Sequence, residues 1–221
     1  KEASPESQLP WEPEVEPLSF DTDLFGFSVA RINADALTRD QLVACLASQR
    51  GTETRLVYWN APTTTGEEDQ ALSCARELAD FAGGKISYVA DAAALAAGKQ
   101  AQEPSVWPKA DAPSEELLQL GYAAGQSSRF CQDPNLTPEQ FQAVYGAWVR
   151  NSCKRQPGVA DEVLVVRNAA GDLQGFMTLR AKGDTADVGL IAVGEDHRRQ
   201  GVARSLMVAA GKWAAKHSLP K

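Results

Sequence analysis

Three arginines and a glycine stand close together near the C-terminal end of the chain, between an apolar run and a helical pattern. The segment runs Val193-Gly-Glu-Asp-His-Arg-Arg-Gln-Gly-Val-Ala-Arg204. At the start of a helix the backbone N–H groups lack partners and the helix dipole is positive, so an anion is favoured there. Gly201 lets a ligand approach the backbone, while Arg198, Arg199 and Arg204 add positive charge. These residue types in this order predict an anion-binding site.

The distribution of charge along the chain indicates which kind of anion binds. The whole chain has 22 basic and 29 acidic residues and a formal net charge of -7. Residues 180–221 nevertheless hold eight basic and four acidic residues, so this part is positive and the rest is strongly negative. A positively charged segment in an otherwise acidic protein favours a compact phosphate-bearing ligand over an extended polyanion. We therefore predict a small-molecule partner and no nucleic acid.

Cysteine usage and hydropathy exclude other classes of protein. Cys45, Cys74, Cys131 and Cys153 are scattered, without the paired spacing of a zinc site. We predict no metal site, and buried thiols of a reducing compartment rather than two disulfides of a secreted protein. No stretch reaches the roughly 18 consecutive apolar residues of a membrane span, and the first residues lack the apolar core of a signal peptide. The sequence predicts a cytoplasmic protein with no membrane partner.

The elements just before the basic segment have clear local signals. Thr137 and Gln140 form a capping box with Pro138 at the first helical position, which predicts a helix to about Lys154. Two strand patterns follow, and they flank the five residues 168–172, which contain a glycine, as is typical of a hairpin. The predicted strands are residues 163–166 and 173–179. This part of the chain therefore predicts a helix packed on an antiparallel sheet.

A third strand leads directly into the basic segment. A turn at Gly183-Asp184 precedes residues 185–193, which are nearly continuous in apolar residues after Asp187. Such a run is typical of a strand that is central in its sheet and covered on both faces. Residues 198–217 then show apolar residues at helical spacing. We expect this strand and this helix to position the basic segment between them.

The first part of the chain alternates strands and helices. Residues 27–32 predict a strand after a turn at Gly26, residues 39–50 a helix capped by Thr38, and residues 55–59 a short strand. This alternation of strand, helix and strand is typical of an α/β layer. Residues 1–17 carry four prolines and five glutamates, which predict an extended lead-in.

The middle of the chain has weaker signals. Residues 92–101 are rich in alanine and have high helix propensity. Three prolines in residues 103–113 predict a connection of poor order. Ser114 caps a short helix that Gly121 is expected to end, followed by a strand-like stretch to Cys131. We place an α/β domain at 18–130 and a second domain at 131–221.

The second domain resembles a known family. The run Arg198-Arg-Gln-Gly201-Val-Ala203, after a strand that ends at Val193, is similar to the acyl-CoA signature of the GNAT superfamily of N-acetyltransferases. Helix, hairpin, strand and signature occur in the order of that family over residues 137–221. The resemblance implies an α/β (α+β) fold with a mixed, largely antiparallel sheet flanked by helices. The smaller N-terminal α/β domain would precede it.

The resemblance also implies the ligand and its contacts. In that family the ligand is acetyl-CoA, whose diphosphate lies on the amides of the signature and whose pantetheine arm pairs with the strand before it. That strand splays from its neighbour. The cofactor-binding residues that the resemblance implies are Ile191, Ala192, Val193, Arg198, Arg199, Gln200, Gly201, Val202, Ala203 and Arg204.

A narrower likeness concerns the acceptor. The segment Phe20-Asp-Thr-Asp-Leu-Phe-Gly26 with Val29-Ala-Arg-Ile32, and Gly121-Tyr122 further on, resembles two-part enzymes that acetylate nucleotide-linked aminodeoxysugars of the TDP-fucosamine type. This implies a small-molecule amine as acceptor. Asp21 and Asp23 could hold such an amine, although as turn formers they need no such role.

The chain departs from the family after its last helix. The family continues with a further strand, helix and hairpin that supply an Asn…Tyr pair, whereas this chain stops at Lys221. We therefore expect an incomplete domain whose apolar sheet edge is covered by further residues or by a partner strand, as in a homodimer. The tyrosine that commonly reprotonates the CoA thiolate has no counterpart by motif among Tyr58, Tyr88, Tyr122 and Tyr145.

The sequence assigns no catalytic residue. Glu162, Asp187 and Glu195 are the nearby acidic candidates for a general base, and their spacing does not choose between them. His197 is expected to be a solvated neighbour of the phosphate site. The predicted function is N-acetylation of a primary amine. The alternatives are acetylation of a protein or peptide N-terminus and binding of acyl-CoA without turnover.

Overall fold

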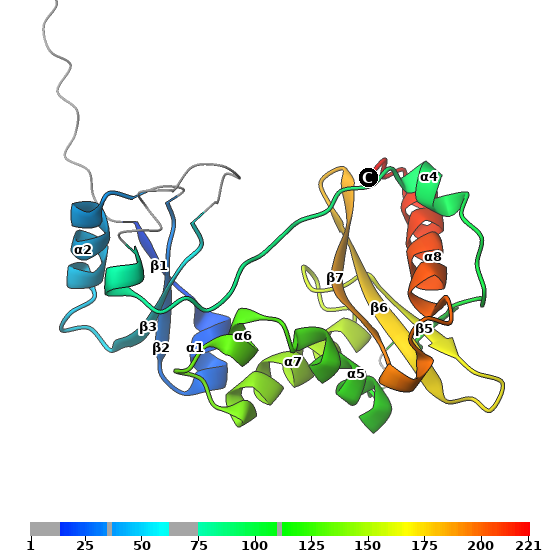
Figure 1. Cartoon of the computed structure of the whole chain (residues 1–221), viewed down its shortest axis with the longest axis horizontal. Helices are drawn as coiled ribbons and strands as arrows, with labels where there is room; N and C mark the ends of the chain where they lie inside the picture. The colour runs from blue at the N-terminus through cyan, green and yellow to red at the C-terminus, as the bar shows by residue number, and fades with distance from the viewer. Residues whose placement is uncertain (1–13, 35–36, 62–74, 110–111) are drawn as a thin grey trace, which may run out of the picture. The chain divides into compact units, whose positions relative to one another are not determined.

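The computed structural model describes residues 14–34, 37–61, 75–109 and 112–221. The chain divides into two compact units, Lys1–Phe81 and Ala82–Lys221 (Figure 1). Each unit has its own sheet and its own buried residues. The first is the smaller one, and its mixture of helices and strands confirms the predicted α/β class.

The N-terminal unit is built on a three-stranded sheet. Its elements are β1 (Val15–Pro17), α1 (Ser19–Phe25), β2 (Ser28–Ile32), α2 (Arg39–Ser48) and β3 (Thr54–Trp59). The strand order is β1-β2-β3, with β1 antiparallel and β3 parallel to β2. Both strands predicted from the sequence, β2 and β3, are present.

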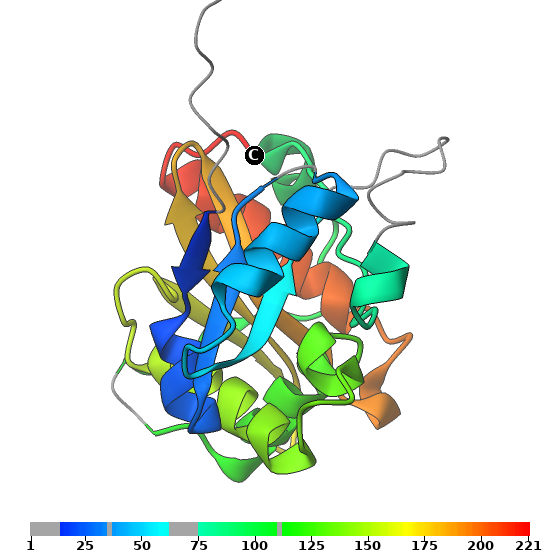
Figure 2. The ribbon, with the colours of Figure 1, turned by 90° about the vertical axis from the view of Figure 1, so that its left-hand side faces the viewer.

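Local capping explains where the helices of this unit begin and end. The Thr38 hydroxyl accepts from the Gln41 backbone N–H, and the Gln41 side chain accepts from the Thr38 backbone N–H, so the predicted capping box starts α2. Apolar residues of α2 pack on Ile32 and Leu37 and bury Cys45 against the sheet. In Figure 2 this helix, in light blue, lies across the strands.

The turn predicted before β2 is also present, but its first part is helical. Gly26 ends α1 in the left-handed conformation with a φ of 72°, a conformation that glycine adopts at little cost. Asp21 and Asp23 therefore lie in helix α1 and not in a turn, and Asp21 is buried. Of the predicted lead-in, residues 1–13 lie outside the described residues, and Val15–Pro17 form β1.

The C-terminal unit is built on an antiparallel sheet of order β4-β5-β6-β7. Its strands are β4 (Ser105–Val106), β5 (Glu162–Arg167), β6 (Leu173–Lys182) and β7 (Thr185–Val193). Its helices are α4 (Ala92–Ala96), α5 (Glu115–Gly125), α6 (Arg129–Gln132), α7 (Pro138–Cys153), the short 3-10 helix η1 (Glu195–His197) and α8 (Val202–Lys216). The two hairpins and the capping box at Thr137 are as predicted. The largely antiparallel sheet flanked by helices is thereby confirmed.

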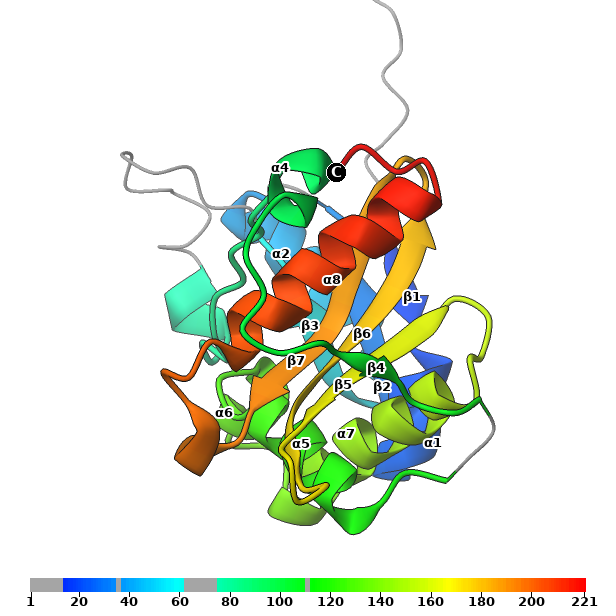
Figure 3. The same ribbon diagram turned by 90° about the vertical axis from the view of Figure 1, so that its right-hand side faces the viewer.

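Helices cover both faces of this sheet. Leu206 and Ala210 of α8 pack on one face, on buried side chains of β5 and β6 such as Leu164 and Met177. Helix α4 lies along α8 on the outside (Figure 3). Helices α5 and α7 contact the opposite face. The helix α8 therefore begins at the end of β7, on a sheet that is held from two sides.

The prediction that residues 185–193 form a central strand is wrong. β7 is an edge of the described sheet: it pairs with β6 on one side only. On its other side, the Ala186 backbone N–H donates to the Lys221 carbonyl at 2.7 Å. The apolar run arises because α8 contacts one face of β7 and α5 the other, while Ile191 keeps 37% of its surface exposed.

Three predictions for the middle of the chain are also wrong. The strand expected up to Cys131 is absent, because α5 continues through Gly121 to Gly125 and α6 follows. A Cβ atom on Gly121 would lie 2.4 Å from Val149 Cγ2, and one on Gly125 2.4 Å from the Tyr145 ring. These glycines therefore permit close packing of α5 on α7 instead of ending the helix. In the expected connection 103–113, residues 105–106 pair with β5 as strand β4.

The compact units divide after Phe81, whereas the sequence placed the boundary at residue 130. Helices α4 and α5 accordingly lie with the C-terminal sheet. Of the three cysteines in the described residues, Cys45 and Cys153 are buried thiols, as predicted, and Cys131 is exposed. Within the described residues, no helix has the length and apolar character needed to cross a membrane.

Candidate active site

The basic segment forms the connection from β7 to α8, as predicted. Gly194 leads into η1, and Gly201 is the N-cap residue of α8 with a φ of 83°. No side chain caps this helix, and no acidic residue stands in its first turn. The positive end of the helix dipole is therefore not offset by the helix itself.

The backbone N–H groups of this connection are available to a ligand. From Arg199 to Arg204, no backbone N–H has a hydrogen-bond acceptor within the described part of the chain, whereas the Ser205 N–H donates to the Gly201 carbonyl at 2.9 Å. Arg199 also has a positive φ of 63°. Non-glycine residues adopt this region rarely, and such conformations cluster at ligand-binding segments. The local backbone thus has the properties of an anion-binding site.

A cavity of about 250 Å³ lies at this helix start. Seven of the ten residues predicted to contact the cofactor line it, together with His197: Val193, Arg198, Arg199, Gly201, Val202, Ala203 and Arg204. Ile191, Ala192 and Gln200 do not line the cavity. The Gln200 side chain instead donates to the Asp196 carbonyl at 2.9 Å.

The strand before the cavity presents alternate residues to its open edge. The Gly194 N–H donates to the Gln174 carbonyl of β6 at 2.9 Å. Because backbone groups alternate in direction along a strand, Ala192 also faces β6, and Ile191 and Val193 face the open edge. The Arg198 guanidinium donates to the Val193 carbonyl at 3.4 Å. Of the three strand residues predicted to pair with a ligand, two therefore present their backbone outward.

Two contacts near the cavity could not be predicted from the sequence. The Ser205 hydroxyl accepts from the backbone N–H groups of Ala101 and Gln102, at 3.1 Å each, so a segment far away in the chain lies on the first turn of α8. His197 is not merely a solvated neighbour: its Nδ1 atom lies 3.5 Å from Nε2 of the buried Gln174. Neither partner could be identified from local spacing.

The acidic candidates for a general base lie in ion pairs. Glu162 contacts Arg155 at 2.8 Å, Asp187 contacts Arg180 at 2.5 Å, and Glu195 lies 3.4 Å from Arg198. None of the three lines the cavity.

Of the aromatic residues of α7, Tyr145 is buried, whereas Phe141 and Trp148 are half-buried. Tyr145 packs on Phe141 with ring centroids 5.0 Å apart and stacks on Trp148 at 5.9 Å. Burial raises the pKa of the Tyr145 hydroxyl above its ordinary value.

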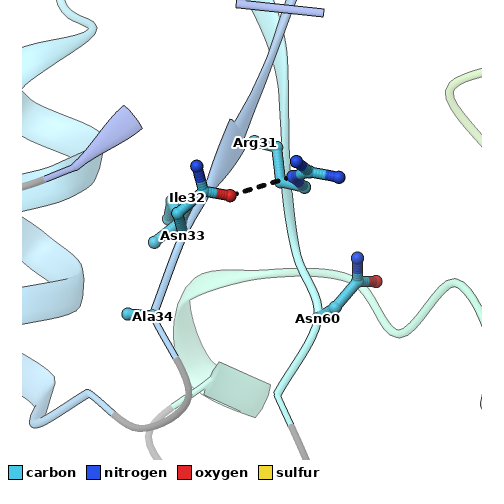
Figure 4. Close-up of a pocket in the computed structure, with 5 residues that line it drawn as sticks. All are labelled: Arg31, Ile32, Asn33, Ala34 and Asn60. Atoms are coloured by element: carbon cyan, nitrogen blue, oxygen red, sulfur yellow. Dashed lines mark hydrogen bonds between the residues drawn. The ribbon is translucent and has the colours of Figure 1, made fainter. Parts of the chain in front are cut away.

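A second cavity, of about 410 Å³, lies in the N-terminal unit and was not predicted. Its lining residues are Arg31, Ile32, Asn33, Ala34 and Asn60 (Figure 4). These residues are at the carboxyl ends of the parallel strands β2 and β3, where ligands often bind in α/β sheets. Arg31 donates to the Asn33 side chain at 3.0 Å, and both donate to Glu16. Hydrogen bonds from Asn33 and Arg31 lower the pKa of Glu16.

Comparison with known proteins agrees with the fold of the C-terminal unit and with the site at the signature. Residues 128–221 match the model of the acetyltransferase (GNAT) family. This match confirms the resemblance to that family expected from the sequence.

Two known proteins match most of the chain. A dTDP-fucosamine acetyltransferase of Escherichia coli O6:H1 (strain CFT073) is 29% identical over 219 residues, which cover 93% of this chain and 83% of that protein. The crystal structure of a conserved protein of unknown function from Staphylococcus epidermidis ATCC 12228 has a TM-score of 0.55 and 14% identity. The match covers 88% of this chain and 74% of that one, and it indicates a shared fold.

Proposed function

We propose that the protein transfers the acetyl group of acetyl-CoA to the primary amine of a nucleotide-linked aminosugar. The observation that carries this proposal is the cavity at the start of α8, where backbone N–H groups without acceptors in the described chain meet three arginines. Doubly charged diphosphate suits such a site, because the helix dipole, the free amides and the guanidinium groups all favour negative charge.

The residues of the site suit the two parts of coenzyme A. The amides of Arg199 to Ala203 would hold the diphosphate, with Arg198, Arg199 and Arg204 as cationic partners. The outward backbone groups of Ile191 and Val193 would pair with the pantetheine arm. Ala192 pairs with β6 instead, because its own backbone groups face that strand.

Acetyl-CoA supplies an activated thioester. A neutral amine that attacks its carbonyl forms the new C–N bond and loses one proton. The C–S bond breaks, and the sulfur takes up a proton and leaves as the thiol of CoA. The contribution of this chain is to bind and align the two reactants, with a backbone N–H of β7 available to polarise the carbonyl. We assign no catalytic base, because Glu162, Asp187 and Glu195 do not line the cavity.

The acceptor class has support from the relative. The E. coli protein that matches 93% of this chain is named for dTDP-fucosamine. The aromatic and glycine segments of the first sixty residues resemble enzymes of that kind independently of the acetyltransferase signature. A nucleotide-linked aminosugar is therefore the acceptor that we propose.

Release of free thiol from acetyl-CoA tests this function. The full chain is incubated with acetyl-CoA and, in turn, dTDP-fucosamine, other nucleotide-linked aminosugars, peptides with free N-termini, and polyamines. We expect thiol release with the aminosugar nucleotides and a rise in melting temperature with CoA alone.

Other results would redirect the proposal. Thiol release with peptides alone would make the protein a peptide N-terminal acetyltransferase. Stabilisation by CoA without thiol release from any acceptor would indicate a binding protein. No stabilisation by CoA at millimolar concentration would contradict the site itself.

A further inference from the structure

The strand β7 contains one extra residue at the point where it is most deeply buried. Met177 of β6 pairs with Ile191, but Leu179 pairs with Val188. Gly189 and Leu190 of β7 therefore stand opposite a single residue of β6, Thr178. An arrangement of two residues against one is a β-bulge, and bulges often redirect a strand next to a functional site.

The side chain of Thr178 completes the hydrogen bonding at this bulge. The Leu190 backbone N–H donates to the Thr178 hydroxyl oxygen at 2.8 Å. Both residues are buried, with 1% of Thr178 and 4% of Leu190 exposed. Gly189 leaves the space for this contact, because a Cβ atom there would lie 2.8 Å from the same oxygen. Without that oxygen, a buried N–H would lack this partner.

The extra residue decides which backbone groups face the open edge of β7. Ala186 faces that edge, since its N–H donates to the Lys221 carbonyl. Strict alternation from Ala186 would turn Leu190 and Ala192 toward the edge as well. Instead Leu190 donates to Thr178 and Gly194 donates to Gln174, both on β6. Because of the bulge, the edge is formed by Ile191 and Val193.

We propose that Thr178 is a positioning residue for ligand binding: its hydroxyl holds the bulge of β7 and so directs the backbone of Ile191 and Val193 to the open edge. Thr178 does not touch the ligand. This role rests on the proposed function, because it assumes that this edge binds the arm of acetyl-CoA. The bulge itself can be tested without that assumption.

Amide hydrogen exchange in the full chain tests the hydrogen bond. The reference is the Asp161 N–H, which lies just before β5 and donates to the Leu179 carbonyl at 2.8 Å. We expect Leu190 to be protected in the wild type and in Thr178→Ser. Thr178→Val, of similar shape but without the hydroxyl, should exchange at Leu190 at least about tenfold faster, with Asp161 unchanged.

Affinity for acetyl-CoA, measured by calorimetry, tests the positioning. We expect Thr178→Val to weaken binding about tenfold, a loss within the range for one hydrogen bond, and Thr178→Ser to stay within about twofold of wild type. The matched control is Val149→Ala on α7, which loses buried packing in the same unit. It should lower the melting temperature without changing this affinity.

Each outcome decides the proposal. If Leu190 exchanges in the wild type as fast as an exposed amide, or if Thr178→Val keeps both wild-type protection and wild-type affinity, the proposal is wrong. If Thr178→Val does not fold, the wild-type protection of Leu190 and the behaviour of Thr178→Ser still decide it. A wild-type chain that binds no acetyl-CoA contradicts the proposed function and the positioning role together, while protection at Leu190 would still establish the bulge.

Discussion

A methyl group placed on Gly201 would lie 3.0 Å from the Cβ atom of Ala101. These two residues are far apart in the sequence, and the Ser205 hydroxyl holds Ala101 in place through its backbone N–H. The signature glycine is therefore packed against protein on one side and lines the cavity on the other. A larger residue at this position would change both the packing on Ala101 and the lining of the cavity.

The first prediction separates these consequences. Gly201→Ala should lose about 1–2 kcal/mol of stability because its φ is positive, and it should weaken CoA binding by about tenfold or more. Gly171→Ala is the control, since its φ is 96° and no atom lies within 4 Å of the added Cβ. It should lose similar stability and keep wild-type CoA affinity. Equal affinities for CoA in the two variants would contradict the role of Gly201.

The second prediction concerns the charge around the cavity. Arg204 is exposed and lines it, whereas Lys216 is at the far end of the same helix. At low ionic strength Arg204→Met should weaken CoA binding roughly three- to tenfold, and Lys216→Met should leave it unchanged. Salt screens exposed charges, so the difference between the two variants should shrink at about 0.5 M salt. A difference that does not depend on salt would argue against a phosphate contact.

The third prediction concerns the stability of the C-terminal unit. Only 7% of the Arg155 side chain is exposed; it pairs with Glu162 and donates to the Trp107 carbonyl at 2.7 Å. Arg155→Met should lower the free energy of unfolding in urea by about 3 kcal/mol, because it leaves Glu162 without its cationic partner. Glu195→Gln breaks a pair in which Glu195 is 84% exposed and should cost less than about 1 kcal/mol. Losses of equal size would show that the Arg155 pair contributes no more than a surface pair.

The fourth prediction is a pH dependence at Tyr145. Its raised pKa, caused by burial, means that the folded state holds the phenol proton more tightly than the unfolded state does. The free energy of unfolding should therefore fall as the pH rises above about 10, the ordinary pKa of tyrosine. Urea unfolding at about pH 8 and pH 10.5 should show a smaller loss for Tyr145→Phe than for the wild type. Equal losses of unfolding free energy in the wild type and in Tyr145→Phe would show that Tyr145 does not contribute to the pH dependence.

Elements with strong local signals could be predicted from the sequence. The capping boxes at Thr38 and Thr137 form as expected, because each needs only residues three positions apart. The β5–β6 hairpin likewise depends on its own turn. The connection from β7 to α8 also follows from local residue types, and seven of the ten expected contact residues line the cavity there.

Features that depend on distant partners could not be predicted. Gly121 is typical of a helix end, yet it lies inside α5, because Val149 of α7 occupies the space of its missing side chain. The apolar run of β7 is equally compatible with a central strand and with an edge strand between two helices. The bulge is set by Thr178 on another strand, and no pattern within β7 indicates it.

The central claim is that the free backbone N–H groups at the start of α8 bind the diphosphate of coenzyme A. The most direct measurement is a titration of the full, nitrogen-15-labelled chain with CoA, followed through its amide resonances. We predict saturable shifts that are largest at Gly201, Val202 and Ala203. Saturable binding that leaves these three resonances unchanged, with shifts confined to other parts of the chain, would contradict the claim.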